Sequence, residues 1–374
     1  MILSRRRLLS GICSTPFIQL LPGLSLAASN NTSDKRFVLV ILRGAMDGLA
    51  AVQPFGDPDL EMHRERLLVP EPQLLKLDSF FALHPALANM YSLYHAGELE
   101  VCHAVATPYR SRSHFDAQHV LETGLSDVQP SATGWLNRCA GYLSASSTTA
   151  MAVGSQLPKV LQGSNEVGSW SPDNLPGTAQ DTLERLQRLY SEDAFLGARF
   201  EQGIMADSLV SGTGMGPGNR GAQNLAQLAD AAARFLSQED GPVIAVLESS
   251  GWDTHAGQGA EQGRLAQRLA ELDNAINVLR NGLQSFWHTT QILVVTEFGR
   301  TVAVNGTGGT DHGTASAAFR TGGAVNGGRI TTDWPGLASG NLLEGRDLRP
   351  TLDMRDLFRD AVRHILGHVP VDVV

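Results

Sequence analysis

The order strand, helix, strand between residues 243 and 295 most constrains the fold of this chain. Residues 243–248 and 292–295 are two almost continuous apolar runs. Between them, leucine and isoleucine recur every three or four positions from Leu265 to Leu283, which is the spacing of one apolar stripe on a helix. A strand, a crossover helix and a second strand form a parallel pair in one sheet. The sequence therefore predicts an α/β fold with a mostly parallel sheet.

Other segments fit the same architecture. Residues 37–42 are apolar throughout, as expected of a strand covered on both faces, and residues 100–106 indicate a further strand. Helical spacing is present in residues 84–97, 225–236 and 354–366, and we expect the last of these helices to cover the sheet.

The middle of the chain gives weaker signals. We interpret residues 29–374 as a single domain with an irregular insertion around 131–222. Inside the insertion, residues 135–143 and 181–200 suggest helices and residues 151–153 suggest a short strand. Glycine is frequent in the rest of the insertion, near residues 211–223, which we expect to form a loop.

Residues 1–28 resemble a twin-arginine signal peptide. Arg5, Arg6 and Arg7 precede two leucines, a moderately apolar run follows, and small residues at Ala27 and Ala28 suit a peptidase. The alternative is a basic, disordered N-terminus. The signal predicts passage through the twin-arginine translocase and a periplasmic or secreted protein, and no later apolar run is long enough for a stable membrane anchor.

Charge and cysteine content limit the partners. Removing residues 1–28 takes away three arginines and no acids, so the formal charge falls from −9 to −12. An acidic chain cannot neutralise many phosphates, which argues against nucleic acid as a partner. Cys102 and Cys139 remain. An oxidising compartment would allow a disulfide between them, although two separate buried thiols is the interpretation we favour.

Polar residues lie in the loops that follow four of the predicted strands. Asp47 comes after the first strand, a group of arginines, Ser113 and His114 after the second, Asp253 and His255 after the third, and Glu297 and Arg300 after the fourth. In an open parallel sheet, sites form outside the carboxyl ends of the strands. We therefore expect these side chains to meet at one edge.

Asp253 and His255 are two residues apart, so in extended backbone both point to the same side. With His312 and Asp311 they offer oxygen and nitrogen ligands without thiolate, a set that suits one or two divalent ions; zinc, manganese, magnesium and calcium are not distinguished. The alternative is that Asp253 caps a turn and His255 is simply solvated.

Two further carboxylates are candidate metal ligands. Glu297 follows a buried strand at a position with no packing reason to be acidic. It is also placed to pair with Arg300 or to cap a helix. Asp47 can bridge the same centre, or can belong to an ordinary Asp-Gly turn with Gly48.

The segment after the second strand combines arginine, hydroxyl and imidazole groups. Arginine binds phosphate and sulfate oxygens through forked hydrogen bonds, so the candidate substrate-binding residues are Arg43, Arg110, Arg112 and Arg300. Ser113 beside His114 is the candidate catalytic pair. An arginine-rich surface loop with an ordinary serine is the alternative.

Seven motifs together resemble the domain-of-unknown-function 1501 family. They occur in order between residues 37 and 336. The seven motifs are residues 42–49, 81–85, 109–116, 133–136, 251–255, 296–301 and 309–313. The family is similar in fold to the alkaline phosphatase and sulfatase superfamily, a three-layer α/β sandwich, and its members are typically exported by the twin-arginine pathway.

That resemblance implies roles for individual positions. It places Asp47 at the first metal-bridging aspartate, Ser113 at the nucleophile, Asp253 and His255 at one metal, and His312 at the late metal-binding histidine. Glu297 stands where the superfamily has an Asp-His pair, and Phe298 occupies the place of that histidine.

These observations predict an exported, metal-dependent hydrolase of small phosphate or sulfate esters. Ser113 or a metal-held water would attack the ester. The alternative is a non-catalytic periplasmic protein of the same fold that binds an anionic ligand or an envelope partner.

Overall fold

The computed structural model describes residues 34–130, 132–143, 149–172 and 224–374, with isolated positions between 186 and 197. The expected signal peptide, the expected loop at 211–223 and most of the expected helix at 181–200 lie outside the described residues. The described part of the insertion contains α6 (Trp135–Ala140) and two strands of the main sheet, β6 (Ala150–Val153) and β7 (Gly168–Trp170).

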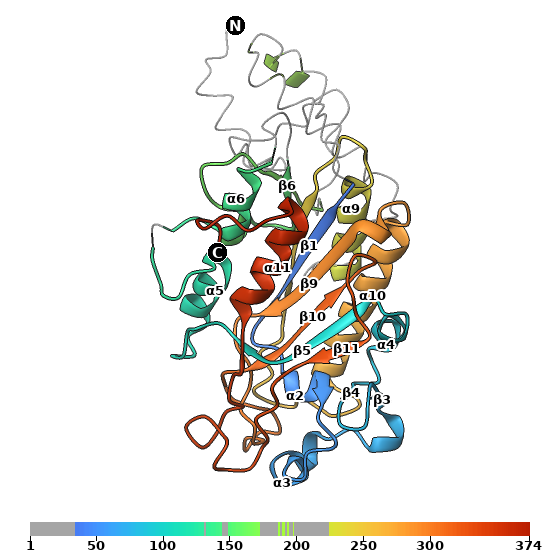
Figure 1. Cartoon of the computed structure of the whole chain (residues 1–374), viewed down its shortest axis with the longest axis vertical. Helices are drawn as coiled ribbons and strands as arrows, with labels where there is room; N and C mark the ends of the chain where they lie inside the picture. Colours follow the sequence, from blue (N-terminus) through green and yellow to red (C-terminus); the bar gives the residue numbers. More distant parts are fainter. Residues whose placement is uncertain are drawn as a thin grey trace, which may run out of the picture.

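A nine-stranded sheet crosses the molecule in the order β11-β5-β10-β9-β1-β8-β6-β7, with β12 paired to β5 (Figure 1). Its remaining strands are β1 (Arg36–Arg43), β5 (Leu99–Ala106), β8 (Ile244–Ser250), β9 (Thr290–Thr296), β10 (Ser316–Thr321), β11 (Arg329–Thr331) and β12 (Leu352–Asp353). β1 pairs in parallel with both β8 and β9, so the predicted strand–helix–strand unit is confirmed, with β1 between its two strands.

One strand runs against the others. β10 is antiparallel to β5 and to β9, so β5 has the same direction as β9 and β1. The four strands predicted from sequence therefore all end at the same edge of the sheet. The antiparallel strand was not predicted. Its sequence is short and alanine-rich, and it follows a glycine-rich loop.

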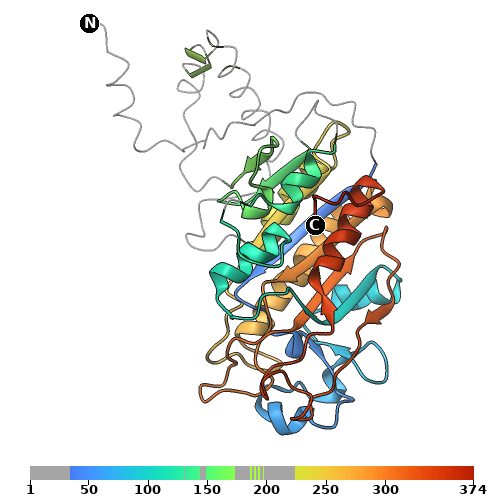
Figure 2. The same ribbon diagram turned by 60° about the vertical axis from the view of Figure 1, so that its left-hand side comes forward.

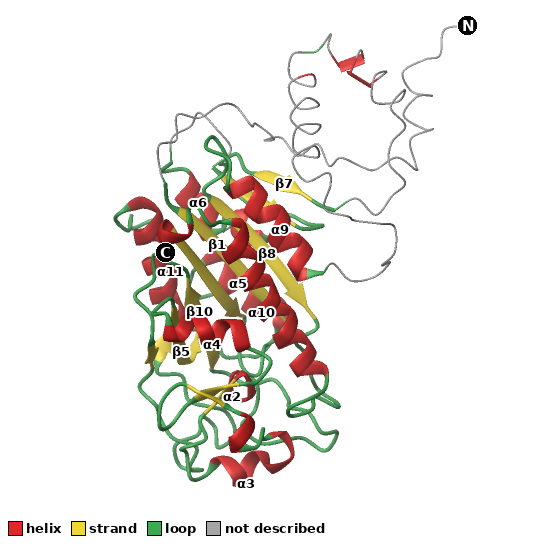
Figure 3. Cartoon of the chain, turned by 90° about the vertical axis from the view of Figure 1, so that its right-hand side faces the viewer, coloured by secondary structure: helices red, strands yellow, loops and turns green. Residues whose placement is uncertain are grey.

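Helices cover both faces, which makes three layers (Figures 1 and 2). One face carries α4 (Ala88–His95), α9 (Leu225–Leu236) and α10 (Arg264–Gly282), and the other carries α5 (His114–Thr123), α6 and α11 (Met354–Leu366). The predicted helices correspond to α4, α6, α9, α10 and α11. Figure 3 shows α9 and α10 side by side along the sheet.

The fully apolar sequence of β1 explains its central place. Val38, Val40 and Leu42 pack beneath α9 and α10, while Phe37, Leu39 and Ile41 pack beneath α11 and α6. Successive strand residues alternate between faces, so only a strand covered twice is apolar at every position. Burying one such side chain stabilises the fold by roughly 1.5–3 kcal/mol.

Smaller elements lie beyond the carboxyl ends of the strands. A three-stranded sheet joins β2 (Val52–Gln53), β4 (Ala82–Leu83) and β3 (Leu75–Lys76), near α2 (Gly48–Ala51) and α3 (Leu60–Arg64). Short 3-10 turns occur at Glu65–Leu67, Glu71–Gln73, Lys159–Leu161 and Trp287–Thr289. The small sheet, α2 and α3 lie together at one end of the molecule, beyond the carboxyl ends of the strands (Figure 1). The turn at Trp287–Thr289 directly precedes β9 and lies at the opposite end of that strand.

Cys102 and Cys139 are free and buried, as favoured from the sequence. Burial raises the pKa of each thiol to about 12, which keeps both protonated. Among the described residues, every helix is too short or too polar to cross a membrane.

Candidate metal centre

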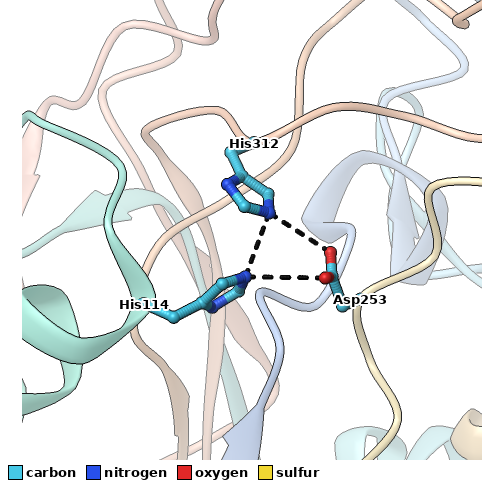
Figure 4. Close-up of side chains that lie close together, drawn as sticks. All are labelled: His114, Asp253 and His312. Carbon is cyan, nitrogen blue, oxygen red and sulfur yellow. Dashed lines mark hydrogen bonds and ion pairs between the residues drawn. The ribbon is translucent and has the colours of Figure 1, made fainter.

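His114, Asp253 and His312 come together at the carboxyl edge of the sheet (Figure 4). Their donor atoms all lie within 4.8 Å of one another. His114 is the first residue of α5, Asp253 follows β8, and His312 lies in the loop between β9 and β10. Three segments that are far apart in sequence thus supply the three-residue group.

The distances inside the group are those of ligands around a common point. His114 Nε2 lies 3.0 Å from His312 Nε2 and 3.6 Å from Asp253 Oδ2, and His312 Nε2 lies 3.4 Å from Asp253 Oδ1. His255 adjoins the group, with its Nε2 at 3.0 Å from His312 Nε2 and 3.1 Å from Asp253 Oδ1. Two tetrahedral zinc ligands would be separated by about 3.3 Å, given zinc–nitrogen bonds of about 2.05 Å.

The other ring nitrogen of each histidine faces an acceptor. His114 Nδ1 is 2.8 Å from Glu297 Oε1, and His255 Nδ1 is 3.3 Å from Asp311 Oδ1. His312 Nδ1 is 3.2 Å from the carbonyl oxygen of Arg112. A carbonyl or an ionised carboxylate only accepts, so these partners assign the proton of each neutral ring to Nδ1.

That assignment leaves three Nε2 lone pairs directed at one another and at a carboxylate. Lone pairs 3.0 Å apart repel unless a proton or a cation lies between them. Imidazole nitrogen and carboxylate oxygen are ligands for zinc and other borderline divalent ions, and a carboxylate behind a ligating histidine is a frequent outer partner. The donor set therefore fits a divalent cation.

Charges around the group keep the ligands in suitable states. The hydrogen bond to Glu297 raises the pKa of His114, whereas burial and the charge on His114 lower the pKa of His312. The opposite directions mean that His114 takes up an additional proton before His312 does. Burial opposes ionisation of Asp253, but the hydrogen bond and charge of Arg300 outweigh it and lower the pKa of Asp253.

Glycine permits the close approach of the loops. Gly44 has φ +118°, and a Cβ there would lie 2.6 Å from the backbone nitrogen of Asp253. A Cβ at Gly313 would lie 2.3 Å from the carbonyl carbon of Arg300. Larger residues would push Asp253 and His312 apart.

Glu297 lies beside the three-residue group and holds one of its members. Its side chain is buried, and its Oε1 accepts hydrogen bonds from Gly44 N, His114 Nδ1 and Gln118 Nε2. Burial alone would raise the pKa of Glu297, but the bonds from His114 and Gln118 lower it. Gln118, one turn after His114 on α5, was missed by sequence reasoning because a lone helical glutamine carries no signal.

Phe298 packs directly against two of the histidines. Its ring centroid is 4.8 Å from that of His114 and 5.2 Å from that of His312. Phe298 therefore forms an apolar wall beside the two imidazole rings.

Asp47 is tied to other groups. It is buried, its Oδ2 accepts from Arg64 Nη1 at 2.8 Å and Gln258 Nε2 at 2.7 Å, and its Oδ1 has no hydrogen-bond partner among the described residues. Gln258 Oε1 accepts from Thr254 and Thr310, which joins Asp47 to the loops of the centre. Neither Arg64, the last residue of α3, nor Gln258, in the loop before α10, was identified from sequence, since neither belongs to a motif.

Comparisons with known proteins place the chain in a family. The model described as "Protein of unknown function (DUF1501)" matches residues 34–364. The chain belongs to this family. The match confirms the resemblance that the sequence motifs indicated, and no curated protein matches the sequence.

Solved structures similar to this family member include zinc-containing and hydrolytic proteins. The C-terminal periplasmic domain of EcEptC from Escherichia coli, in complex with Zn, has TM-score 0.41 and 9% identity over 81% of this chain and 77% of that one. A phosphonate monoester hydrolase of Agrobacterium radiobacter has TM-score 0.39 and 12% identity over 90% and 78%. The PsFucS1 sulfatase from Pseudoalteromonas sp. has TM-score 0.41 and 14% identity over 92% and 69%. TM-scores and sequence identities this low say nothing about the activity of this chain.

The candidate substrate-binding arginines of this family member all have partners within the chain. Arg43 donates to Glu122 and Glu248, and Arg110 donates to the carbonyl oxygens of Thr107 and Tyr109. Arg112 donates to Asp347 and Glu344. Arg300 is buried and donates to Asp253 and to Thr310.

Ser113 is the N-cap residue of α5, directly before His114. Its hydroxyl makes no cap hydrogen bond, and within the described part of the chain no imidazole or carboxylate is hydrogen-bonded to it. Both nitrogens of the adjacent His114 are engaged with Glu297 and His312. A serine nucleophile needs a base within hydrogen-bond reach, and none contacts Ser113 in this arrangement.

Proposed function

We propose that this protein is an exported, metal-dependent hydrolase of small phosphate or sulfate esters. The observation that carries the proposal is the convergence of three Nε2 lone pairs on the carboxylate of Asp253, with His114 and His312 3.0 Å apart. Neutral imidazoles take up such an arrangement around a cation.

The residues divide into ligands and their supports. His114, Asp253 and His312 would hold the ion, with His255 beside them as a further ligand. Glu297 and Asp311 would fix the histidine rings through Nδ1, and Arg300 would keep Asp253 ionised and oriented. Two or three imidazoles favour zinc or manganese over magnesium or calcium. When bound, the ion would act as a Lewis acid on an ester oxygen.

The same residues indicate an anionic substrate. His114, His312 and Asp253 have side chains that are 25%, 28% and 40% exposed, so a ligand can reach them from solvent. The N-terminal turn of α5, which begins at His114, adds the partial positive charge of a helix end. Hydrolysis would place the oxygen of water on phosphorus or sulfur, while the ester oxygen leaves and takes up a proton.

Water is the nucleophile that the geometry supports best. Ser113 has no base within hydrogen-bond reach, so we assign the attack to a water held at the exposed side of the group. A direct displacement leaves no covalent intermediate on the chain.

The second candidate is a non-catalytic protein that binds an anionic ligand or an envelope partner. The pairing of Arg43, Arg112 and Arg300 with carboxylates of the chain favours it, because these guanidinium groups are not available to an ester.

Metal content and activity together test these proposals. We expect the purified protein, without residues 1–28, to contain a stoichiometric divalent metal and to lose it in Asp253→Ala and His312→Ala. His288→Ala, which changes an exposed histidine, is the matched control. Aryl phosphates, aryl phosphodiesters and aryl sulfates would identify the ester class. Metal binding without turnover of any ester would support the non-catalytic candidate, and a wild-type protein that binds no metal would contradict both the site and the activity.

Export is tested separately. We propose that Arg5, Arg6 and Arg7 direct the chain to the twin-arginine translocase, on the strength of their place before the apolar run. Replacing all three by lysine should keep a fused reporter in the cytoplasm. Unchanged export after this replacement would contradict the proposed route.

A further inference from the structure

Asp347 is a completely buried carboxylate in the loop between β11 and β12. Three donors surround it. Arg112 Nε and Thr314 Oγ1 each lie 2.8 Å from Asp347 Oδ2, and Arg346 Nε lies 3.3 Å from Oδ1. A buried charge is costly unless it is paired and hydrogen-bonded. Asp347 therefore holds Arg112 and Thr314 through hydrogen bonds to Oδ2 and Arg346 through a longer ion pair, while Oδ1 has no hydrogen-bond partner among the described residues.

Each of the three donors is also connected to His312, either by a hydrogen bond or by its place in the sequence. The carbonyl oxygen of Arg112 accepts from His312 Nδ1, at 3.2 Å. Arg346 Nη2 donates to the carbonyl oxygen of His312, at 2.6 Å. Thr314 lies two residues after His312. The ring and the backbone of one candidate metal ligand are thus both held by groups that Asp347 anchors.

The backbone of Arg112 makes the anchoring necessary. Arg112 has φ +60°, in the left-handed region that residues other than glycine rarely adopt. Such a conformation persists only where surrounding contacts enforce it. Glu344 also pairs with Arg112, but its side chain is 61% exposed and its contribution is screened by solvent. Asp347 is fully buried and therefore remains as the effective anchor.

We propose that Asp347 is a positioning residue of the metal centre. It acts through Arg112 and Arg346 to keep the proton of His312 on Nδ1 and the Nε2 lone pair directed toward Asp253. Arg112 accordingly serves the centre through its carbonyl oxygen, and its guanidinium group holds that carbonyl in place. The metal-binding consequence rests on the proposed function, whereas the orientation and tautomer of His312 do not.

The first measurement is zinc affinity. Metal-stripped protein would be titrated with Zn²⁺ against a competing chelator in wild type, Asp347→Asn, Arg112→Met and the double variant. Loss of an outer partner of a metal ligand weakens binding by about 10- to 100-fold. We expect Asp347→Asn to lie near the lower end of that range. Glu344→Gln, which removes the exposed partner of the same arginine, should leave zinc affinity unchanged.

The double variant tests the route. Because Asp347 acts largely through Arg112, the two losses of zinc affinity should not add. The double variant should have about the same zinc affinity as the single variant with the larger loss. Fully additive losses would contradict a shared route. Unchanged zinc affinity in a folded Asp347→Asn variant would overturn the proposal. If Asp347→Asn does not fold, Arg112→Met tests the same link, because the Arg112 side chain is partly exposed.

The second measurement needs no metal. Nitrogen NMR of histidine-labelled, metal-stripped protein, well above the ordinary histidine pKa, reports the tautomer of His312. We expect the Nδ1-protonated form in wild type and in Glu344→Gln, and a mixture of tautomers in Asp347→Asn and Arg112→Met. An unchanged His312 signal in both latter variants would overturn the positioning role. If wild type binds no zinc, but the His312 tautomer changes in Asp347→Asn and Arg112→Met as expected, only the proposed function is contradicted.

Discussion

His114 Nε2 and His312 Nε2 lie 3.0 Å apart, although 198 residues separate them in sequence. Each ring is directed by an acceptor on its far side, Glu297 for His114 and the Arg112 carbonyl for His312. Contacts within the chain therefore set the position of both nitrogens. Pre-set ligands lower the conformational cost of binding an ion.

Glu297→Gln should weaken metal binding while leaving the fold intact. Gln keeps the shape of the side chain but removes the charge that holds the Nδ1 proton of His114, so zinc affinity should fall by about 10- to 100-fold. Competition with a chelator gives the affinity, and far-ultraviolet circular dichroism checks the fold. Glu248→Gln, a carboxylate that pairs with Arg43, is the control. Equal affinities for wild type and Glu297→Gln would show that Glu297 does not support the site.

Ser113→Ala should retain most of any hydrolytic activity. Because no base contacts the Ser113 hydroxyl, its removal should change kcat by less than about a factor of ten, far below the loss of about 10⁶-fold seen when a true serine nucleophile is removed. Steady-state kinetics on an aryl ester provides the comparison, with metal content measured in parallel. A metal-loaded Ser113→Ala protein without activity would instead identify Ser113 as the nucleophile.

Arg64→Met should destabilise the protein strongly. Arg64 and Asp47 are both about 1% exposed, and removing one partner of a buried ion pair leaves an uncompensated charge at a cost of about 3–5 kcal/mol. Urea denaturation of metal-stripped protein measures the change in unfolding free energy. Arg66→Met, at an exposed arginine two residues away, should have little effect. A similar result for both variants would mean that the buried pair contributes nothing special.

Stability should fall in mild acid partly because of His103. Burial lowers the pKa of His103 to about 4, and the ring is fully enclosed beside Val52 and Phe81. In the unfolded chain its pKa is about 6.5, so the unfolded state takes up the proton first and stability is lost as pH falls through this interval. Between about pH 7 and about pH 5, His103 should account for about 2 kcal/mol of the loss.

His103→Gln should therefore show a shallower decline over that interval. Urea denaturation of metal-stripped protein at several pH values would provide the comparison, with His288→Gln as the exposed control. Parallel pH profiles for wild type and His103→Gln would contradict the assignment.

Local periodicity was sufficient to predict the main elements. The apolar stripe of α10 and the continuous apolar runs of β1, β8 and β9 are signals between near neighbours in sequence, and the structure confirms all four. The meeting of their loops at one edge followed from the parallel direction of the strands. β10 was missed because an alanine-rich strand between two others has no pattern that distinguishes it from a loop.

Roles at the site depended on contacts between distant residues. Sequence placed Asp253, His255 and His312 in one set but assigned His114 to catalysis and Arg112 to substrate. The structure places His114 within the three-residue group, Glu297 behind it, and the Arg112 guanidinium on Asp347. No spacing rule could show this, because Glu297 lies 183 residues from His114 and Asp347 lies 235 residues from Arg112.

The α/β class, the family and the edge of the sheet where polar groups gather could all be read from the amino-acid order, because they depend on side-chain type and short-range periodicity. Folding establishes which nitrogen of each histidine faces the others, and which carboxylates support the group without belonging to it. Both features depend on hydrogen bonds between segments that are far apart in sequence and meet only in the folded chain. Local sequence patterns carry no information about these distances of a few ångströms.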